Sequence, residues 1–530
     1  MTAITACPTC GRPTTAVALS ETSWLEPATL AQLAAAHPHW QKEDGTCPAC
    51  VQQALLYTWL SQGDAALHDH VQRVWPLDAA AAFGAIPTPL RLHADPRFTG
   101  RGVTMAILDS GFYPHPDLTQ PRNRIRAWVD ATCEPVHVAR FRSDEPPRWP
   151  GWEAGAPAQW HGTMTAVTAA GNGHLSHGLY RGLASEAELV LIQVSDGHGI
   201  HNPAIARALR WLVDHHATWG VRVVNMSFGG DEVATLRGNP VDAAVACLVA
   251  QNVVVTVAAG NDGTRRLVPP ATAPEALTIG GLDDHNTFDH AAVSLWRSNY
   301  GLGVDAARKP DLVAPSIWLA APLLPGTAVA REAQALFQQR GQPESERRIA
   351  GLKLITPHYQ HVDGTSFAAP LVASVVACML QTNPSLTPPL VRQILQQTAT
   401  PIPGAPRERQ GAGALEAGLA VAAALREQHQ TLAAFTVWPR VADGRITFLW
   451  HDHTVQQVQV LGSWDGWQAP GLFLEQAEPG VWLGARPLLP PGRYAYKFLV
   501  DGDTWLDDPA NPRKAWDGHG GFNSVLPLPD

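Results

Sequence analysis

Charged residues are scarce in this chain, and its charge is not gathered into any basic run. Asp, Glu, Lys and Arg make up 16% of the 530 residues, below the roughly 25% that is usual for soluble domains. Acidic residues outnumber basic ones by 47 to 38, which gives a formal net charge of −9. Because a nucleic-acid-binding protein needs a dense basic footprint, the sequence predicts no nucleic acid among its partners.

Long apolar runs and an apolar leader are also missing. Residues Met1–Thr15 contain no cationic stretch followed by an apolar core, which a secretory signal requires. The most apolar runs, Val253–Ala259 and Leu371–Leu380, are much shorter than the roughly 20 residues that span a bilayer. We therefore expect a cytoplasmic protein with no membrane partner.

Cysteines are too few and too unevenly placed for a disulfide scaffold. The chain has seven, and four of them form two CxxC pairs, Cys7 with Cys10 and Cys47 with Cys50. Four thiolates suit a structural, tetrahedral zinc ion, so we expect a zinc-ribbon-like region over residues 1–52. Redox CxxC pairs and chance are the alternatives, although a thioredoxin-like motif needs a βαβ context that is absent here. This region is expected to serve as an adaptor for a protein partner or as a regulatory cover.

Composition divides the rest of the chain into further zones. Residues 53–95 form a helical connector that ends in proline-broken turns. Over residues 96–425, β-branched apolar strands alternate with alanine-rich helices, which is typical of a parallel sheet flanked by helices. After a linker at 426–436, residues 437–530 give short alternating strands between Gly, Asp and Pro turns, as in an immunoglobulin-like β-sandwich. The predicted fold class is α/β, with a C-terminal all-β sandwich and a small N-terminal zinc-binding region.

Four polar residues stand where an α/β sheet places an active site, after strands or at helix starts. Asp109 and Asn261 each follow an apolar run, while His161 and Ser366 each open a predicted helix. A serine hydroxyl becomes a strong nucleophile when an imidazole accepts its proton, and a carboxylate orients that imidazole. An asparagine amide can stabilise the oxyanion that forms. Each motif alone is common, but their order along the chain is hard to obtain by chance.

The segments around these residues resemble the subtilisin family of serine peptidases over residues 100–425. The matching segments are Asp109-Ser110-Gly111, His161-Gly162-Thr163, Val224–Gly229, Ala259-Gly260-Asn261, Lys309–Pro315 and Gly364–Pro370. The resemblance implies a serine endopeptidase acting on polypeptides. The resemblance also implies the roles of four residues: Ser366 is the nucleophile, His161 the general base and then acid, Asp109 the orienting carboxylate and Asn261 the oxyanion donor.

The same resemblance implies how a substrate is held. Ser227, Phe228 and Gly229 would pair with the substrate backbone as an added strand, and Gly260 would line the pocket for the side chain before the scissile bond. Two insertions, at 140–160 and 321–353, are expected to form rims that restrict substrates. Family members often bind calcium, but the sequence identifies no ligands for it. The alternative to an enzyme is a catalytically silent scaffold that keeps only the fold.

The C-terminal zone resembles the glycogen-binding module of the AMP-activated kinase β subunit and related modules of starch enzymes. The likeness covers residues 450–530 and includes Leu461–Trp467, Gly492–Phe498, Val500–Trp505 and Gly521–Asn523. In that family two tryptophans stack on glucose rings, while a lysine and an asparagine bind hydroxyls. Trp467, Trp505, Lys497 and Asn523 occupy the matching positions, which implies binding to glycogen or another α-glucan. The alternative is a sandwich used only for protein contact.

Overall fold

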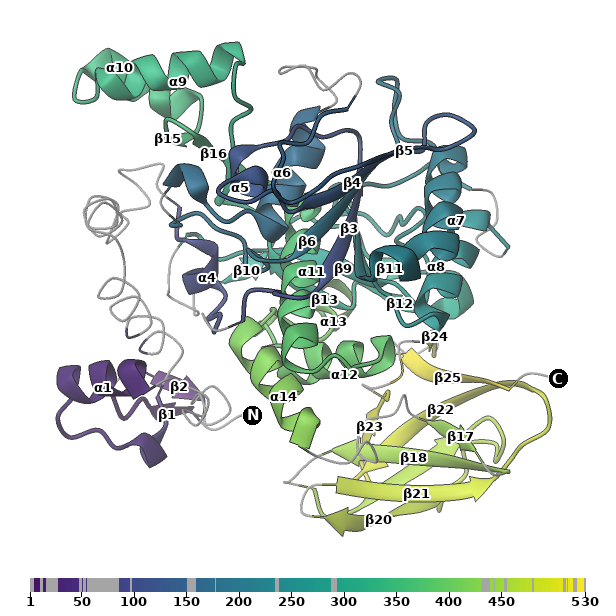
Figure 1. Ribbon diagram of the computed structural model, residues 1–530. Helices are drawn as coiled ribbons and strands as arrows, with labels where there is room; N and C mark the ends of the chain where they lie inside the picture. The colour runs from purple at the N-terminus through teal and green to yellow at the C-terminus, as the bar shows by residue number, and fades with distance from the viewer. Residues whose placement is uncertain are drawn as a thin grey trace.

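The computed structural model describes residues 4–9, 13–15, 27–46, 50, 54, 85–95, 98–149, 159–176, 178–233, 238–286, 293–429, 439–442, 444–451, 455–478, 481–508, 511, 513–517 and 522–528. Cys10, Cys47 and most of the predicted connector at 53–95 lie outside the described residues. The described parts form three units in Figure 1: a small N-terminal hairpin and helix, a large α/β domain and a C-terminal all-β module.

A nine-stranded sheet forms the centre of the large domain, in the order β10-β9-β8-β7-β3-β6-β4-β5, with β13 also beside β9. The pairings that join β4, β6, β3, β7, β8, β9 and β13 are parallel, and β5 and β10 add antiparallel edges. The predicted α/β architecture is thus confirmed. The strands are β3 (Thr104–Asp109), β4 (Ile125–Asp130), β5 (His137–Arg140), β6 (Glu188–Gln193), β7 (Val221–Met226), β8 (Val254–Ala258), β9 (Leu277–Asp283), β10 (Ser294–Leu295) and β13 (Leu312–Pro315).

Helices cover both faces of this sheet, which is why its strands are almost continuously apolar. On β3, Met105 and Ile107 face the core shared with α6 (Gln159–Ala170), α11 (Thr365–Thr382), α12 (Pro388–Thr398) and α14 (Ala417–His429). Ala106 and Leu108 face the opposite core, shared with α7 (Asn202–Trp219) and α8 (Pro240–Ala250). Shorter helices are α4 (Thr88–Arg91), α5 (Pro116–Thr119) and α13 (Arg407–Gln410).

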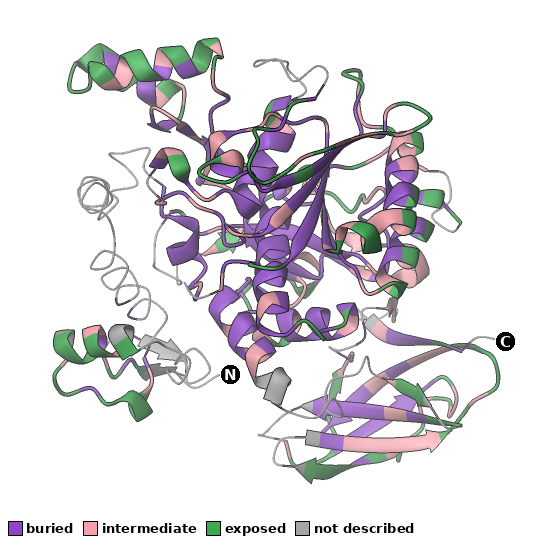
Figure 2. Ribbon diagram, viewed as in Figure 1, coloured by how far each residue is buried: buried purple, intermediate pink, exposed green. Residues whose placement is uncertain are grey.

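Helix α11 runs through the middle of the domain. Among the described residues it is the one helix long and apolar enough to cross a membrane, yet 89% of it is buried in protein. It contacts α6, α14, β7, β8, β9 and β13, and Figure 2 shows it buried together with the sheet. This burial accounts for its apolar composition, because every face of the helix meets other protein atoms.

The insertion expected at 321–353 projects from the domain as a helical hairpin (Figure 1). It consists of α9 (Ala328–Gln338) and α10 (Pro343–Gly351), which share a small core with Leu323 and Leu354. The hairpin is carried by a sheet of β14 (Leu319–Pro322), β16 (Tyr359–Val362) and β15 (Leu354–Thr356). Strand β16 leads directly into α11, and a separate short ribbon joins β11 (Gly301–Leu302) to β12 (Arg308–Lys309).

The C-terminal module is antiparallel throughout its described pairings, as the sequence predicts for a sandwich. Strand β20 pairs with β19 through Leu472–Leu474 and with β21 from Glu475 onward, so it links the strands on either side of it. Phe448, Tyr496 and Phe498 are among the fully buried core residues. The strands are β17 (Arg440–Ala442), β18 (Arg445–His451), β19 (Val458–Gly462), β20 (Leu472–Glu478), β21 (Val481–Pro487), β22 (Gly492–Val500), β23 (Thr504–Leu506), β24 (Lys514–Trp516) and β25 (Phe522–Leu528).

Candidate active site

The sheet and two helices bring the candidate catalytic residues to one edge of the large domain. Asp109 is the last residue of β3, Ser227 follows β7, and Asn261 comes shortly after β8. His161 lies in the first turn of α6 and Ser366 in the first turn of α11. Because the carboxyl ends of parallel strands share one edge of a sheet, residues far apart in the chain meet there.

Asp109 and His161 form a direct hydrogen bond. The Nδ1 atom of His161 lies 2.7 Å from Oδ1 of Asp109, and an ionised carboxylate can only accept, so Nδ1 carries the proton. The backbone N–H of Ser110 and the hydroxyl of Thr165 also donate to the fully buried carboxylate, at 2.7 and 3.1 Å. This arrangement leaves Nε2 of His161 without a proton and able to act as a base.

Two opposing effects set the basicity of His161. Its side chain is only 25% exposed, and burial lowers the pKa of an imidazole because the charged form loses hydration. The negative charge of Asp109 and the hydrogen bond to it act in the other direction and prevail, so the pKa of His161 is raised above its ordinary value. The site therefore favours the imidazolium that forms when serine gives up its proton.

The hydroxyl of Ser366 donates a hydrogen bond to the carbonyl oxygen of Ser227 at 2.8 Å. The ring of His161 lies against the neighbouring Phe367, with ring centroids 5.9 Å apart. Rotation about the single χ1 bond of Ser366 would redirect its hydroxyl, since a serine side chain has three staggered rotamers. In this structure the hydroxyl of Ser366 is therefore bonded to a backbone carbonyl, and the residue after it contacts the ring of His161.

Thr365 fixes the orientation of Asn261. The side-chain oxygen of Asn261 accepts hydrogen bonds from the backbone N–H and the hydroxyl of Thr365, at 3.0 and 2.9 Å. The Thr365 hydroxyl also accepts from the N–H of Gly260 at 3.1 Å. With its oxygen held in this way, Asn261 keeps its amide N–H groups for an oxyanion. Sequence reasoning missed Thr365, although its place directly before Ser366 was the available signal.

The predicted substrate-binding residues lie around the same edge. Ser227 and Phe228 are buried and Gly229 is exposed. Among the described residues this segment pairs with no strand. Gly260 has a φ of 103°, and a Cβ atom there would lie 2.6 Å from the side-chain nitrogen of Asn299. Asn299, which the sequence analysis did not single out, thus backs the position predicted to line the pocket.

The described residues contain no cluster of acidic side chains that could be identified as a calcium site. No group of three or more His, Cys, Asp or Glu side chains gathers there. The carboxylate of Asp117 is fully buried in α5. Its carboxylate accepts hydrogen bonds from the hydroxyl of Tyr359 at 2.6 Å and from the N–H of Leu175 at 3.0 Å. Protein donors therefore occupy both of its oxygens.

Comparison with known proteins assigns families to both folded units. Residues 100–413, more than half of the chain, match the subtilase family. The chain belongs to the subtilase family. Its large domain is a subtilase domain, as the sequence motifs predict. Residues 445–529 match the family described as the glycogen recognition site of AMP-activated protein kinase.

Similar proteins include several bacterial proteases. The chain is 30% identical over 308 residues to serine protease AprX of Bacillus subtilis (strain 168), a match that covers 56% of this chain and 61% of AprX. It is 29% identical over 304 residues to subtilisin BL of Lederbergia lenta, covering 57% and 85% of the two chains. The crystal structure of fervidolysin from Fervidobacterium pennivorans aligns with a TM-score of 0.47 and 19% identity, over 82% of this chain and 57% of that one.

In the C-terminal module, the structure places the four predicted glucan-binding residues on β22, β23, β25 and the turn after β19. The rings of Trp467 and Trp505 lie 6.2 Å apart at an angle of 57°, and Trp505 is 43% exposed. The ammonium group of Lys497 donates to Asp517 at 2.5 Å. Asn523 is half-buried. The two tryptophans therefore lie close together, Trp505 exposed and Trp467 half-buried, while the charge of Lys497 is already paired.

We expect the pH dependence of peptide hydrolysis to report the Asp109–His161 pair. Neutral His161 is the active base, so kcat/KM should rise with pH through a pKa above the ordinary value of about 6.5. Asp109→Asn removes the cause of the raised pKa, so the rising limb should move to lower pH and kcat should fall by about 10⁴-fold. Asp130→Asn, the same change at the end of β4, is the control and should leave the profile unchanged. An unshifted limb in Asp109→Asn would show that another group controls it.

Proposed function

We propose that this protein hydrolyses internal peptide bonds of polypeptides with Ser366 as the nucleophile. The observation that carries the proposal is the hydrogen-bonded Asp109–His161 pair at the sheet edge that also holds Ser366 and Asn261. Nε2 of His161 takes the hydroxyl proton as the Ser366 oxygen attacks the substrate carbonyl. The amide of Asn261 and the backbone N–H of Ser366 then stabilise the oxyanion.

The second half of the reaction uses the same groups. The imidazolium of His161 donates its proton to the leaving amine, and the acyl group stays on Ser366. Water then attacks the ester, giving its proton to His161, and the serine is released with the carboxylic acid product. Ser227–Gly229 would hold the substrate as an added strand, and Gly260 would border the pocket for the preceding side chain.

Ser366→Ala should abolish both peptide hydrolysis and labelling by a fluorophosphonate probe, because the probe forms a bond only with an activated serine oxygen. Labelling is measured on gels of the purified full chain. Ser374→Ala, on the buried part of α11, is the matched control and should keep labelling. A folded wild-type protein that takes up no probe would favour the alternative of a catalytically silent scaffold.

We further propose that the C-terminal module binds glycogen or another α-glucan through Trp467, Trp505, Lys497 and Asn523. The family match over 445–529 and the neighbouring tryptophans, of which Trp505 is exposed, support this. Aromatic faces suit the apolar faces of glucose rings, and neighbouring polar groups set the orientation of the chain.

Co-sedimentation with glycogen tests the glucan proposal. Trp467→Ala and Trp505→Ala should each weaken binding by about tenfold, which corresponds to the loss of one ring contact. The double variant should no longer sediment. Phe473→Ala removes a similarly exposed aromatic ring from β20 and should have no effect. Binding that survives in the double variant would leave the protein-contact alternative.

We also propose a structural zinc ion held by Cys7, Cys10, Cys47 and Cys50. The sulfur of Cys7 lies 3.7 Å from the hydroxyl of Thr46, the residue before Cys47. Cys7 and Cys50 are both buried in one cluster with Leu33 and Trp40. One cysteine of each CxxC pair thus belongs to the same small cluster, which supports a shared four-thiolate site. A zinc-binding region of this kind, over residues 1–52, would offer a surface to a protein partner.

Metal analysis of the full chain should find about one zinc ion per molecule, because closed four-thiolate sites bind the metal tightly. Cys7→Ser together with Cys50→Ser should remove it. Cys133→Ser, which changes an exposed cysteine of the large domain, should leave the zinc content unchanged. A zinc content well below one in carefully prepared wild-type protein would contradict the proposal.

A further inference from the structure

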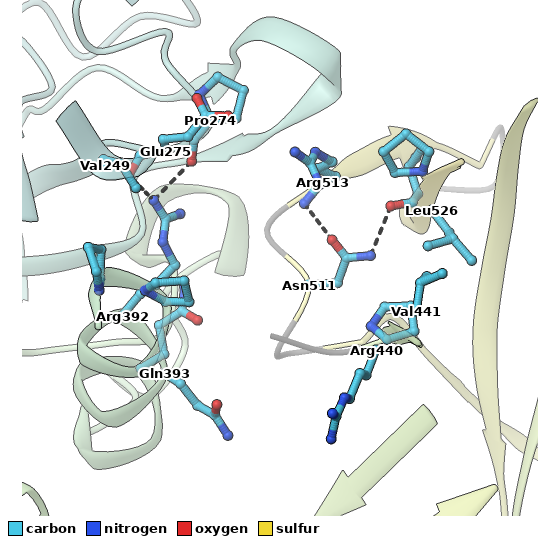
Figure 3. Close-up of a pocket in the computed structure, with 16 residues that line it drawn as sticks. Val249, Pro274, Glu275, Arg392, Gln393, Arg440, Val441, Asn511, Arg513 and Leu526 are labelled. Carbon is cyan, nitrogen blue, oxygen red and sulfur yellow. Dashed lines mark hydrogen bonds between the residues drawn. The ribbon is translucent and has the colours of Figure 1, made fainter. Parts of the chain in front are cut away.

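The C-terminal module contacts the peptidase domain at the sheet edge opposite to Ser366, and a cavity of about 470 Å³ lies between the two units (Figure 3). On the peptidase side its lining includes Val249 at the end of α8 and Glu275 just before β9. These positions mark the amino ends of strands β8 and β9, whereas the catalytic residues follow the carboxyl ends. The module supplies residues from β17, β25 and the segment before β24.

Polar contacts outside the cavity also join the two units. The guanidinium of Arg493 on β22 donates to the backbone oxygen of Asp305 at 3.0 Å. Asp507 of the module lies between Arg308 and Arg407 of the peptidase domain, at 3.6 and 3.5 Å. Asp507 and Arg308 are both largely buried, and a buried pair constrains geometry strongly because neither partner can be left unpaired without cost.

The cavity adjoins the predicted glucan-binding residues on one face of a sheet. Side chains alternate along β22, so Lys497 and Arg493 share the face opposite to the core residue Tyr496. Pro527 of β25 pairs with Arg493, and Val525 pairs with Ala495, which points to the same side of β22 as Arg493. Val525 and Pro527 both line the cavity. Asn523 lies two residues before Val525, about 7 Å along the same strand, so one outer face carries both features.

One buried amide in the lining has no hydrogen-bond partner within the part of the chain that the structure describes. Gln393 of α12 is only 6% exposed, and neither its side-chain oxygen nor its nitrogen finds a hydrogen bond among the described residues. The Nε atom of Arg513, on the module side, is also buried and unbonded in this part of the chain. Leaving such groups unsatisfied is costly, and a hydroxyl can both donate to the amide oxygen and accept from the nitrogens. The remaining lining is rich in proline and valine.

We propose that this interdomain cavity is a second binding site for an α-linked glucose chain, continuous with the surface formed by Trp467 and Trp505. The inference rests on the proposed glucan binding and extends it to the peptidase domain, which contributes Gln393. The volume falls within the roughly 300–1,000 Å³ of typical ligand sites. Because both units line the cavity, a bound oligosaccharide stabilises their contact.

The test uses the full chain carrying Ser366→Ala, so that self-cleavage does not interfere, and measures the Kd for maltotriose and for maltoheptaose. The short ligand should occupy only the tryptophan surface, while the long one should reach the cavity and bind more tightly. Gln393→Met should raise the Kd for maltoheptaose by about fivefold, the equivalent of one hydrogen bond, and leave that for maltotriose unchanged. Without ligand, its Tm should be equal or higher, because an unsatisfied amide has been removed.

Controls separate this inference from the glucan proposal itself. Gln338→Met makes the same change on the exposed face of α9 and should alter neither Kd. Val525→Trp, which fills the cavity from the module side, should reproduce the selective loss of maltoheptaose affinity. If maltoheptaose binds but both cavity variants bind it as tightly as the parent protein, the cavity site is wrong and the glucan proposal stands. If the parent protein binds neither sugar, the glucan proposal fails and the cavity site fails with it.

Discussion

The packing of α11 against the sheet is the interaction on which the catalytic geometry depends. The helix contacts β7, β8, β9 and β13, as well as α6 and α14. Nearly every residue from Phe367 to Leu380 is buried, and each large apolar side chain so buried contributes about 1.5–3 kcal/mol. Helix α11 therefore cannot shift without opening the core. Since α6 packs on it, His161 and Ser366 are held together by apolar contacts far from the reacting atoms.

The first turn of α11 adds polar constraints to this apolar frame. Gly364 has a φ of 131°, a conformation that side chains rarely allow, and it lets the chain pass from β16 into the helix beside Asn261. Thr365 then fixes the Asn261 side chain, and Ser366 reaches the carbonyl of Ser227. The three successive residues 364–366 thus set the positions of the nucleophile, of the oxyanion donor Asn261 and of the substrate-binding residue Ser227. Such preorganisation is what gives oxyanion stabilisation its effect.

The sequence predicts those parts of the molecule that local patterns encode. Strands β3, β6, β7 and β8 lie within a residue or so of their apolar runs, because strands buried on both faces must be apolar throughout. Asp109 and His161 could be named because each sits in a recognisable short motif. Contacts between distant segments could not be predicted. The bond from Thr365 to Asn261 spans 104 residues and that from Tyr359 to Asp117 spans 242, and no local pattern marks either.

At the edge where the strands begin, buried charged side chains hold the structure in place. Arg392 of α12 donates to Asp311 at 2.6 Å and to three backbone carbonyls before β9. Lys309 donates to the same carboxylate at 2.9 Å, and burial lowers its pKa to about 8. This buried network fixes the start of α12, and with it the neighbouring Gln393 at the interdomain cavity.

The parallel sheet thereby separates two tasks. Peptide chemistry occupies the edge where the strands end, and the module contacts the edge where they begin. A glucan held by the module would tether the enzyme from the side remote from Ser366, so binding would not cover the catalytic cleft.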